Sequence, residues 1–325
     1  MILILSDAND IHADFVASKI QISGLPYVRL NLDVSSLKQT TISYDGNTWD
    51  IGTPCNSFIS DNISCVWMRR AYVELLLEEA NNTETDFKIW RGEWNKTLTG
   101  LYTSLKQVQW LNFYRNAYKA ENKYLQSEVA RKLGFTLPAT IVSNNKEKLL
   151  SFALVHGAVV MKLMNQEFYK TPDGSYKGLY VNKLNSEDLA FFGDSSENPI
   201  VLQKYIEKDF EVRYTVVGDE HFVCKIDSQK SSKAKVDWRR YDLPQTPHYP
   251  IEPPKDIRWK VAQLMSELKL NYGALDFIVS PDGTWVFLEI NSMGQFLWIE
   301  DLTGLKISEG IVNWLQNVHI KYITT

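Results

Sequence analysis

The fold is decided by two apolar stretches near the C-terminal end, Gly273-Ala-Leu-Asp-Phe-Ile-Val279 and Val286-Phe-Leu-Glu-Ile-Asn291. Both stretches are rich in β-branched and aromatic residues, which favour strands. Between them lies Ser280-Pro-Asp-Gly283, a combination that is typical of a tight turn. The sequence therefore predicts a β-hairpin over residues 273–291.

Three polar side chains interrupt the apolar pattern of this hairpin. Asp276 lies on the first strand, and Glu289 and Asn291 lie two residues apart on the second, which places the latter two on one face. Hard oxygen ligands of this kind suit Mg²⁺, which usually takes one or two carboxylates together with nucleotide phosphates and water.

The alternative is a surface hairpin whose polar positions merely alternate outward. It does not explain why Glu289 sits within Phe-Leu-Glu-Ile, where an unpartnered carboxylate would be costly to bury. The residue types alone leave both interpretations open.

An Asp on one strand followed by Glu-x-Asn on the next resembles the C-terminal metal signature of the ATP-grasp ligases. The continuation Gly294-Gln-Phe-Leu-Trp-Ile-Glu-Asp-Leu-Thr-Gly304 is similar to the ATP-grasp peptide maturases of the microviridin type, also called graspetide synthetases. The resemblance spans nearly the whole chain and is much weaker over residues 1–60. It implies an α/β (α+β) ATP-grasp fold with an N-terminal α/β lobe, a small central lobe and a C-terminal ATP-grasp lobe.

Length and composition agree with a multi-lobed globular protein. The chain has 325 residues, enough for two or three lobes with cores of their own. Its hydrophobic content of 44% and charged content of 23% are ordinary for such a protein. A net charge of −4 argues against broad nucleic-acid binding, which usually needs a basic domain.

The cysteines and the N-terminus indicate the compartment in which the protein is expected. Cys55, Cys65 and Cys224 lack C-x-x-C spacing, so neither a zinc site nor a disulfide framework is indicated. The opening run Met1-Ile-Leu-Ile-Leu5 has no basic flank and no small-residue cleavage site, which predicts a buried first strand and not a signal peptide. No apolar stretch approaches the length of a membrane span, so we expect a cytoplasmic protein.

Periodicity divides the chain into three expected regions. Residues 1–115 form an N-terminal pre-ATP-grasp-like α/β domain, 116–199 a central ATP-grasp lobe with a lid loop and leader-peptide contacts, and 200–325 a C-terminal ATP-grasp lobe with the Mg/ATP and catalytic residues. Residues 164–182 are polar, aromatic and glycine-containing, which favours a loop over a regular element. The predicted strands are Ile2–Leu5, Tyr27–Leu32, Thr41–Tyr44, Thr48–Ile51, Ser64–Arg70, Ala139–Val142 and Ala158–Leu163, and the predicted helices are Ile11–Ser23, Trp90–Gln107, Ala120–Leu133, Lys146–His156 and Asp256–Leu268.

Two lysines are candidates for contacts to the nucleotide phosphates. Lys123 opens a predicted helix, and Lys162 lies in the apolar strand Ala158-Val-Val-Met-Lys-Leu163, where an unpartnered ammonium would be expensive. The resemblance implies that both hold the α- and β-phosphates of ATP and that residues 164–178 form a lid over the triphosphate. For Lys162, the alternative is a side chain that reaches solvent from an edge strand.

The segment Val201-Leu-Gln-Lys-Tyr-Ile206 resembles the hinge that reads the adenine edge in this superfamily. The resemblance therefore assigns nucleotide contacts to Gln203, Lys204, Tyr205 and Ile206, although Gln203 replaces the more common Glu. It also assigns the ribose hydroxyls to Glu211, for which a surface strand carboxylate is the alternative.

Arginines complete the candidate site. The resemblance places Arg213, Arg239 and Arg240 against the γ-phosphate or an acyl-phosphate, a role that suits the guanidinium fork. Arg69 and Arg70 end a strand of the first region; they either face the same cleft or are solvated surface charges.

The resemblance implies an ATP- and Mg²⁺-dependent ligase that phosphorylates Glu/Asp side chains of a ribosomal precursor peptide. Thr/Ser hydroxyls, or Lys amines, of the same peptide then close macrocyclic esters or amides. The precursor would carry a leader and a core with Thr/Ser and Glu/Asp residues. Because some members are homodimers, a homodimer is an expected assembly, and neither nucleic acid nor a membrane is an expected partner.

Two alternatives use the same nucleotide site. One is an ATP-grasp amino-acid ligase that adds glutamate or another amino acid to a protein or small-molecule carboxylate. The other is a nucleotide-binding regulatory or scaffold protein that has lost catalysis. Retention of Asp276, Glu289 and Asn291 with the lysines and arginines argues against the scaffold. The segment Gly294–Gly304 and the strand Val66-Trp-Met-Arg-Arg70 favour peptide cyclisation over amino-acid ligation.

Overall fold

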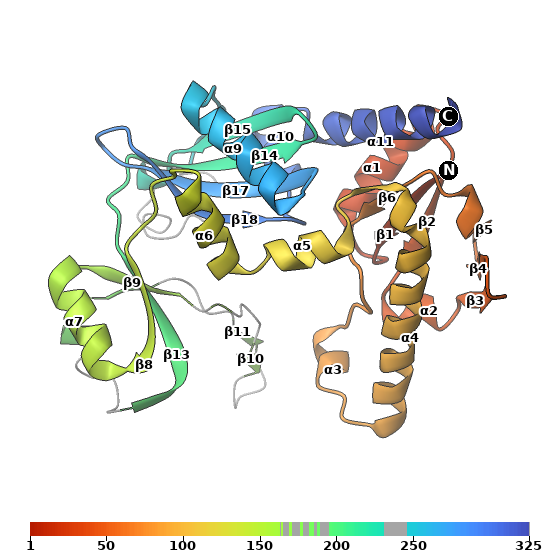
Figure 1. Cartoon of the computed structure of the whole chain (residues 1–325), viewed down its shortest axis with the longest axis horizontal. Helices are drawn as coiled ribbons and strands as arrows, with labels where there is room; N and C mark the ends of the chain where they lie inside the picture. The colour runs from red at the N-terminus through yellow and green to blue at the C-terminus, as the bar shows by residue number, and fades with distance from the viewer. Residues whose placement is uncertain are drawn as a thin grey trace.

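The computed structural model contains three regions of mixed α/β structure (Figure 1). It describes residues 1–162, 164, 169–170, 176–177, 182–184, 187–188, 195–230 and 246–324.

The N-terminal region is built on a parallel sheet with strand order β2-β1-β6-β7. Its first strand is fully buried, as the apolar opening run predicts. Helix α1 begins after Asp10, whose carboxylate accepts hydrogen bonds from the main-chain N–H groups of His12 and Ala13. The main elements are β1 (Ile2–Ser6), α1 (Ile11–Ile22), β2 (Tyr27–Asn31), β6 (Cys65–Met68), α4 (Thr85–Ser104) and β7 (Gln109–Leu111).

The N-terminal region also contains smaller elements. A three-stranded antiparallel sheet contains the two strands predicted at Thr41–Tyr44 and Thr48–Ile51. These elements are α2 (Val34–Leu37), β3 (Thr41–Tyr44), β4 (Trp49–Gly52), β5 (Ser57–Ile59), η1 (Ser60–Asn62), α3 (Leu77–Ala80) and η2 (Leu105–Gln107).

Two helices, not one, connect the N-terminal region to the others. The single helix predicted over 120–133 is preceded by α5 (Tyr114–Ala120), and α6 spans Lys123–Lys132. The break falls at Asn122, whose side chain accepts hydrogen bonds from the N–H groups of Tyr124 and Leu125 and so caps a new helix. This cap makes Lys123 the first residue of α6.

The central region is a four-stranded sheet of order β12-β9-β13-β8, covered by α7. Its strands and helix are β8 (Thr140–Asn145), α7 (Lys146–His156), β9 (Val159–Lys162), β12 (Asn182–Leu184) and β13 (Ser195–Lys204). The prediction of a loop over 164–182 is wrong where this segment is described. There, β10 (Tyr169–Lys170) pairs antiparallel with β11 (Tyr176–Lys177), since main-chain pairing needs no apolar periodicity.

The C-terminal region is an antiparallel sheet of order β16-β15-β14-β17-β18, and the predicted hairpin supplies its last two strands. Helices α6 and α9 cover one face through a core that includes Tyr214, Phe277 and Phe287. The elements are β14 (Phe210–Val217), β15 (Glu220–Ile226), η3 (Ser228–Lys230), β16 (His248–Pro250), α9 (Lys255–Leu268), β17 (Tyr272–Val279), β18 (Trp285–Asn291), α10 (Leu297–Thr303) and α11 (Ile307–Thr324).

The N-terminal and C-terminal regions share one hydrophobic core. Figure 1 shows α11 running beside α1, and buried residues of both helices belong to a cluster that also contains Trp67 and Phe296. The two sheets are therefore fixed against each other by apolar packing. No helix in the described part of the chain is long and apolar enough to cross a membrane.

Candidate active site

The candidate site is a row of charged side chains across three neighbouring strands. Arg213 on β14 lies directly opposite Asp276 on β17, which in turn lies opposite Glu289 on β18. Arg213 Nη1 is 3.0 Å from Asp276 Oδ1 and 3.2 Å from Oδ2. At the other end of the row, Lys123 Nζ is 2.7 Å from Glu289 Oε2. The sheet thus brings four predicted site residues together, with two carboxylates between two cations.

A β-bulge places Glu289 in this row. The register shifts between Asp276 and Phe277, so that Asp276 opposes Glu289 while Phe277 opposes Phe287. Strict alternation would point Glu289 the same way as Phe287, which lies in the core under α9. The bulge adds one residue to β18 and so reverses which side chains of that strand face the core. Phe287 and Ile290, three positions apart, both enter the core as a result. Glu289 and Asn291 are thereby freed to share the opposite face with Asp276.

Arg213 is held in a nearly dry environment, with 6% of the residue exposed. Burial alone would lower the pKa of Arg213, but the adjacent Asp276 carboxylate outweighs it and raises the pKa above its ordinary value. The Nη2 group donates a further hydrogen bond to the Gln295 carbonyl oxygen at 3.2 Å. Arg213 is therefore a permanent cation of fixed orientation.

The donor set suits a hard divalent cation that is shared with phosphates. Among the described residues, no group of three or more His, Cys, Asp and Glu side chains could enclose a metal ion. Asp276, Glu289 and the Asn291 amide instead offer an oxygen-only set with two carboxylates. Such a set leaves positions for phosphate oxygens and water, which matches the usual coordination of Mg²⁺.

The segment Ser292–Gln295, which follows Asn291, has all four of its carbonyl groups held in place. Asn112 Nδ2 donates to Ser292 O at 2.9 Å and Arg69 Nη1 donates to Met293 O at 2.8 Å. Tyr272 donates its hydroxyl to Gly294 O at 2.7 Å, and Arg213 holds Gln295 O. The main chain beside the candidate metal ligands is consequently rigid.

Helix α6 and the turn before it hold β18 and the residue that follows it in place. Buried Gln126 donates to Ile290 O at 2.8 Å and accepts from Ile290 N at 3.0 Å, which completes the pairing of an outer strand. Glu121 accepts hydrogen bonds from the N–H and hydroxyl groups of Ser292. Sequence reasoning missed both residues; the cue that was present is a polar residue, Gln126, at an inward position of an amphipathic helix.

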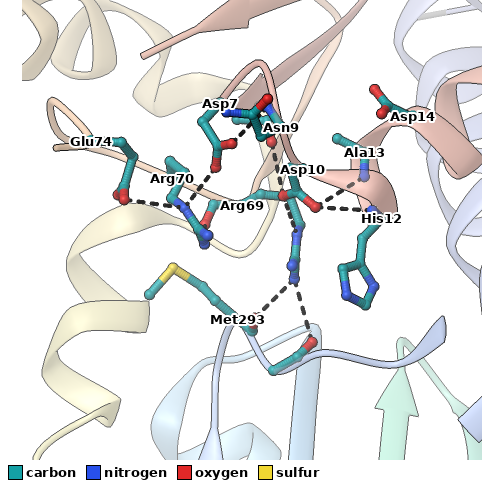
Figure 2. Close-up of polar contacts among 12 residues, drawn as sticks. Asp7, Asn9, Asp10, His12, Ala13, Asp14, Arg69, Arg70, Glu74 and Met293 are labelled. Carbon is teal, nitrogen blue, oxygen red and sulfur yellow. Dashed lines mark hydrogen bonds and ion pairs between the residues drawn. The ribbon is translucent and has the colours of Figure 1, made fainter. Parts of the chain in front are cut away.

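Arg69 is a buried structural cation and not a solvated charge. Figure 2 shows its guanidinium between Asp10 and the Met293 main chain. Its Nε donates to Asp10 Oδ2 at 3.0 Å, and 3% of the residue is exposed. Burial would raise the pKa of Asp10, but Arg69, Ser6 and the α1 main chain lower it to about 2. Burial, reinforced by Arg69, lowers the pKa of the neighbouring His12 to about 4. Arg70 is different, because it is half-buried and pairs with Asp7 and Glu74.

Lys162 is placed on a central strand. Strand β9 lies between β12 and β13, so the interpretation of Lys162 as a lysine on an edge strand is wrong. Lys162 is partly buried and lies opposite Val201. On β13, Gln203 Nε2 donates to Thr140 Oγ1 at 3.1 Å.

The predicted adenine hinge, residues 201–206, overlaps the end of β13 and continues just beyond it. The main-chain N–H groups of Lys204 and Tyr205 donate to the carbonyl oxygens of Ala139 and Ala158. These two N–H groups are therefore already bonded within the protein, and the neighbouring Ile206 is partly buried. Lys183 Nζ lies 4.1 Å from the Tyr205 ring centroid. Glu211 is buried and forms an ion pair with Lys208, so the interpretation of Glu211 as a surface carboxylate is wrong.

Some predicted residues lie outside the described part of the chain. Arg239 and Arg240 fall within 231–245, and most of the predicted lid, 164–178, is likewise outside the described residues.

Comparison with known proteins identifies the family. Residues 1–118 match the family described as the MvdD pre-ATP grasp domain. A RiPP-associated ATP-grasp ligase from Chryseobacterium gregarium, solved with ADP and a leader and core peptide, superposes with a TM-score of 0.87 at 32% identity, covering 97% of this chain and 96% of that one. This chain belongs to the RiPP-associated ATP-grasp ligases.

Two further solved structures are similar to this ligase along its length. The macrocyclase MdnC of Microcystis aeruginosa, bound with precursor peptide MdnA, has a TM-score of 0.85 at 27% identity and covers 97% of this chain and 99% of that one. The macrocyclase MdnB from the same organism has a TM-score of 0.76 at 29% identity, with 97% and 98% covered. No protein of curated function matches the sequence.

Proposed function

We propose that this ligase uses ATP and Mg²⁺ to cross-link side chains of a ribosomal precursor peptide. The observation that carries the proposal is the likeness to the Chryseobacterium ligase over 97% of the chain, because that protein was solved with ADP, a leader and a core peptide. The likeness to two macrocyclases supports ring closure as the outcome.

The residues divide into three roles. Asp276, Glu289 and Asn291 hold the metal ion, which when bound neutralises charge on the nucleotide phosphates. Lys123 and Lys162 hold the α- and β-phosphates. Contacts to adenine and ribose come from Gln203, Lys204, Tyr205, Ile206 and Glu211.

Arg213, Arg239 and Arg240 stabilise the transferring phosphoryl group. In the first step, a carboxylate oxygen of a substrate Glu or Asp attacks the γ-phosphorus, which gives an acyl-phosphate and ADP. In the second, a Thr or Ser hydroxyl, or a Lys amine, attacks the acyl carbon; phosphate leaves and a proton is lost. Catalysis of this kind rests on positioning and on charge stabilisation. The buried, doubly held guanidinium of Arg213 supports such a role, since it needs no reorganisation.

Three finer features belong to the same proposal. The lobes divide at 1–115, 116–199 and 200–325, with the leader segment on the central lobe. The ligase acts in the cytoplasm, a compartment in which its three free cysteines are stable as thiols. A homodimer is the expected assembly.

Reconstitution with a precursor peptide and ATP tests the function. Each ring should remove the mass of one water from the peptide and release one ADP and one phosphate. A peptide that gains the mass of an added amino acid would identify the amino-acid ligase instead. Nucleotide binding without ADP release in the presence of the peptide would identify a regulatory protein.

A further inference from the structure

Two buried polar side chains of the N-terminal region, Asn112 and Arg69, reach the candidate site, and Arg69 is the charged one. Arg69 follows β6, and its Nη1 group donates to Met293 O at 2.8 Å and approaches Gly294 O at 3.4 Å. These carbonyls belong to Ser292–Gln295, which begins one residue after Asn291. The contact therefore joins two regions at the main chain that leads directly from the candidate metal ligands (Figure 2).

Asp10 fixes the Arg69 guanidinium, so the group that binds Met293 O is itself held in place. The Oδ2 atom of Asp10 accepts from Arg69 Nε and from the Ser6 hydroxyl. Its Oδ1 atom accepts from the N–H groups of His12 and Ala13 at the start of α1. Both carboxylate oxygens are thus occupied, and the guanidinium cannot turn without breaking bonds on two sides.

The position of Ser292–Gln295 in turn fixes Arg213. Arg213 Nη2 donates to Gln295 O, and a Cβ atom placed on Gly294 would lie only 2.8 Å from Nη2. Gly294 thus passes against the guanidinium that also holds Asp276. A shift of this segment would move the Arg213–Asp276 pair.

We propose that Arg69, oriented by Asp10, is a positioning residue that fixes Ser292–Gln295 and thereby sets the geometry of Arg213 and Asn291. The N-terminal region thus contributes to catalysis through this contact and not only through its own surface. The inference rests on the proposed function for its kinetic consequence, but its structural consequence is independent of the substrate.

Arg69→Lys is the first test variant. It keeps a cation beside Asp10, but one ammonium cannot span Asp10 and Met293 O as the planar guanidinium does. The double variant Asp10→Asn/Arg69→Met is the second, since it removes both buried charges together and leaves neither unpartnered. Arg29→Met is the matched control, because Arg29 pairs with Asp14 and the Asp7 carbonyl within the N-terminal region alone.

Amide hydrogen exchange of the full chain provides a readout that needs neither peptide nor turnover. In both test variants, peptides covering residues 291–297 should exchange about tenfold faster or more, the factor expected when a hydrogen bond to a charged group is lost. Peptides of β14 and α9 should be unchanged. Turnover should fall by at least about tenfold while the Kd for ATP stays within about twofold of the wild-type value, since the proposed α- and β-phosphate contacts of Lys123 and Lys162 are not displaced.

Unchanged exchange at 291–297 in both test variants would overturn the proposal. Equal acceleration in Arg29→Met would also overturn it, because the effect would then be general loosening. If the ligase proves to act on a different carboxylate, the exchange result still decides the role of Arg69, so the two failures are distinguishable.

Discussion

Replacement of Gly294 by Ala tests whether close packing holds Arg213 in place. The added Cβ would lie 2.6 Å from Ala274 Cβ and 2.8 Å from Arg213 Nη2. Ala274 is fully buried on β17 and cannot yield. Restoring an ordinary contact of 3.4 Å requires Nη2 to retreat by about 0.6 Å, the difference between 3.4 and 2.8 Å. The bond of 3.2 Å to Gln295 O or the pair of 3.0 Å with Asp276 would then break.

The magnitudes separate the effect on stability from that on catalysis. Overpacking should lower the free energy of unfolding by about 1–3 kcal/mol. Displacing one preorganised donor should lower turnover by about 10²–10³-fold, in line with the loss of a single oxyanion-hole donor. Denaturant unfolding and ring formation followed by mass spectrometry measure the two quantities.

Gly310→Ala provides the matched control for crowding. Its Cβ would lie 2.9 Å from Phe222 Cζ, where α11 packs on the sheet. We expect a comparable loss of stability with normal turnover of the folded fraction. Normal turnover by folded Gly294→Ala would refute the argument that this glycine fixes Arg213.

Three further predictions address the metal, the phosphates and pH. Glu289→Gln should stay folded but lose about 3–4 kcal/mol of transition-state stabilisation, and near-normal turnover at saturating Mg²⁺ would count against the metal site. Lys162→Met should weaken ATP binding by at least about tenfold, since a charge-assisted phosphate contact contributes about 1.5–3 kcal/mol; unchanged affinity by calorimetry would place Lys162 outside the site. His12 has a folded-state pKa of about 4, below its ordinary 6.5, so folding disfavours its protonated form. Its contribution to the free energy of unfolding, about 3 kcal/mol, is therefore complete above pH 6.5 and is lost as pH falls toward 4. His12→Gln should flatten the pH dependence of the free energy of unfolding over this interval, and an unchanged profile would show that His12 is not responsible.

The hairpin and its ligands could be predicted from the sequence because their signals are local. Apolar runs rich in β-branched and aromatic residues and the Ser280–Gly283 turn define β17 and β18, and a carboxylate within an apolar run marks Glu289. The first buried strand, α1 and α7 follow from the same kind of pattern. The bulge that turns Glu289 toward Asp276 could not be predicted, because it depends on which residues of β18 enter the core beneath α9.

Residues whose partners lie far away in the sequence could not be predicted either. Asn112 binds the main chain at Asn271, Tyr272 and Ser292, more than 150 positions away in sequence. Arg69 reaches Met293 over a separation of 224 residues. A polar residue at the end of an apolar strand gives no sign of its partner, so Arg69 could not be told from a solvated charge. The roles of Gln203, Lys204, Tyr205 and Ile206 in nucleotide binding stay predictions.

The fate of a labelled substrate oxygen shows whether the ligase activates the substrate carboxylate as an acyl-phosphate. A precursor peptide whose Glu and Asp carboxylates carry heavy oxygen is incubated with the ligase, Mg²⁺ and ATP, and the released phosphate is analysed by mass spectrometry. Attack of the carboxylate on the γ-phosphorus transfers one labelled oxygen to phosphate for every ring that closes. We expect this one-to-one transfer. Label found in AMP, or phosphate free of label while rings form, would contradict it.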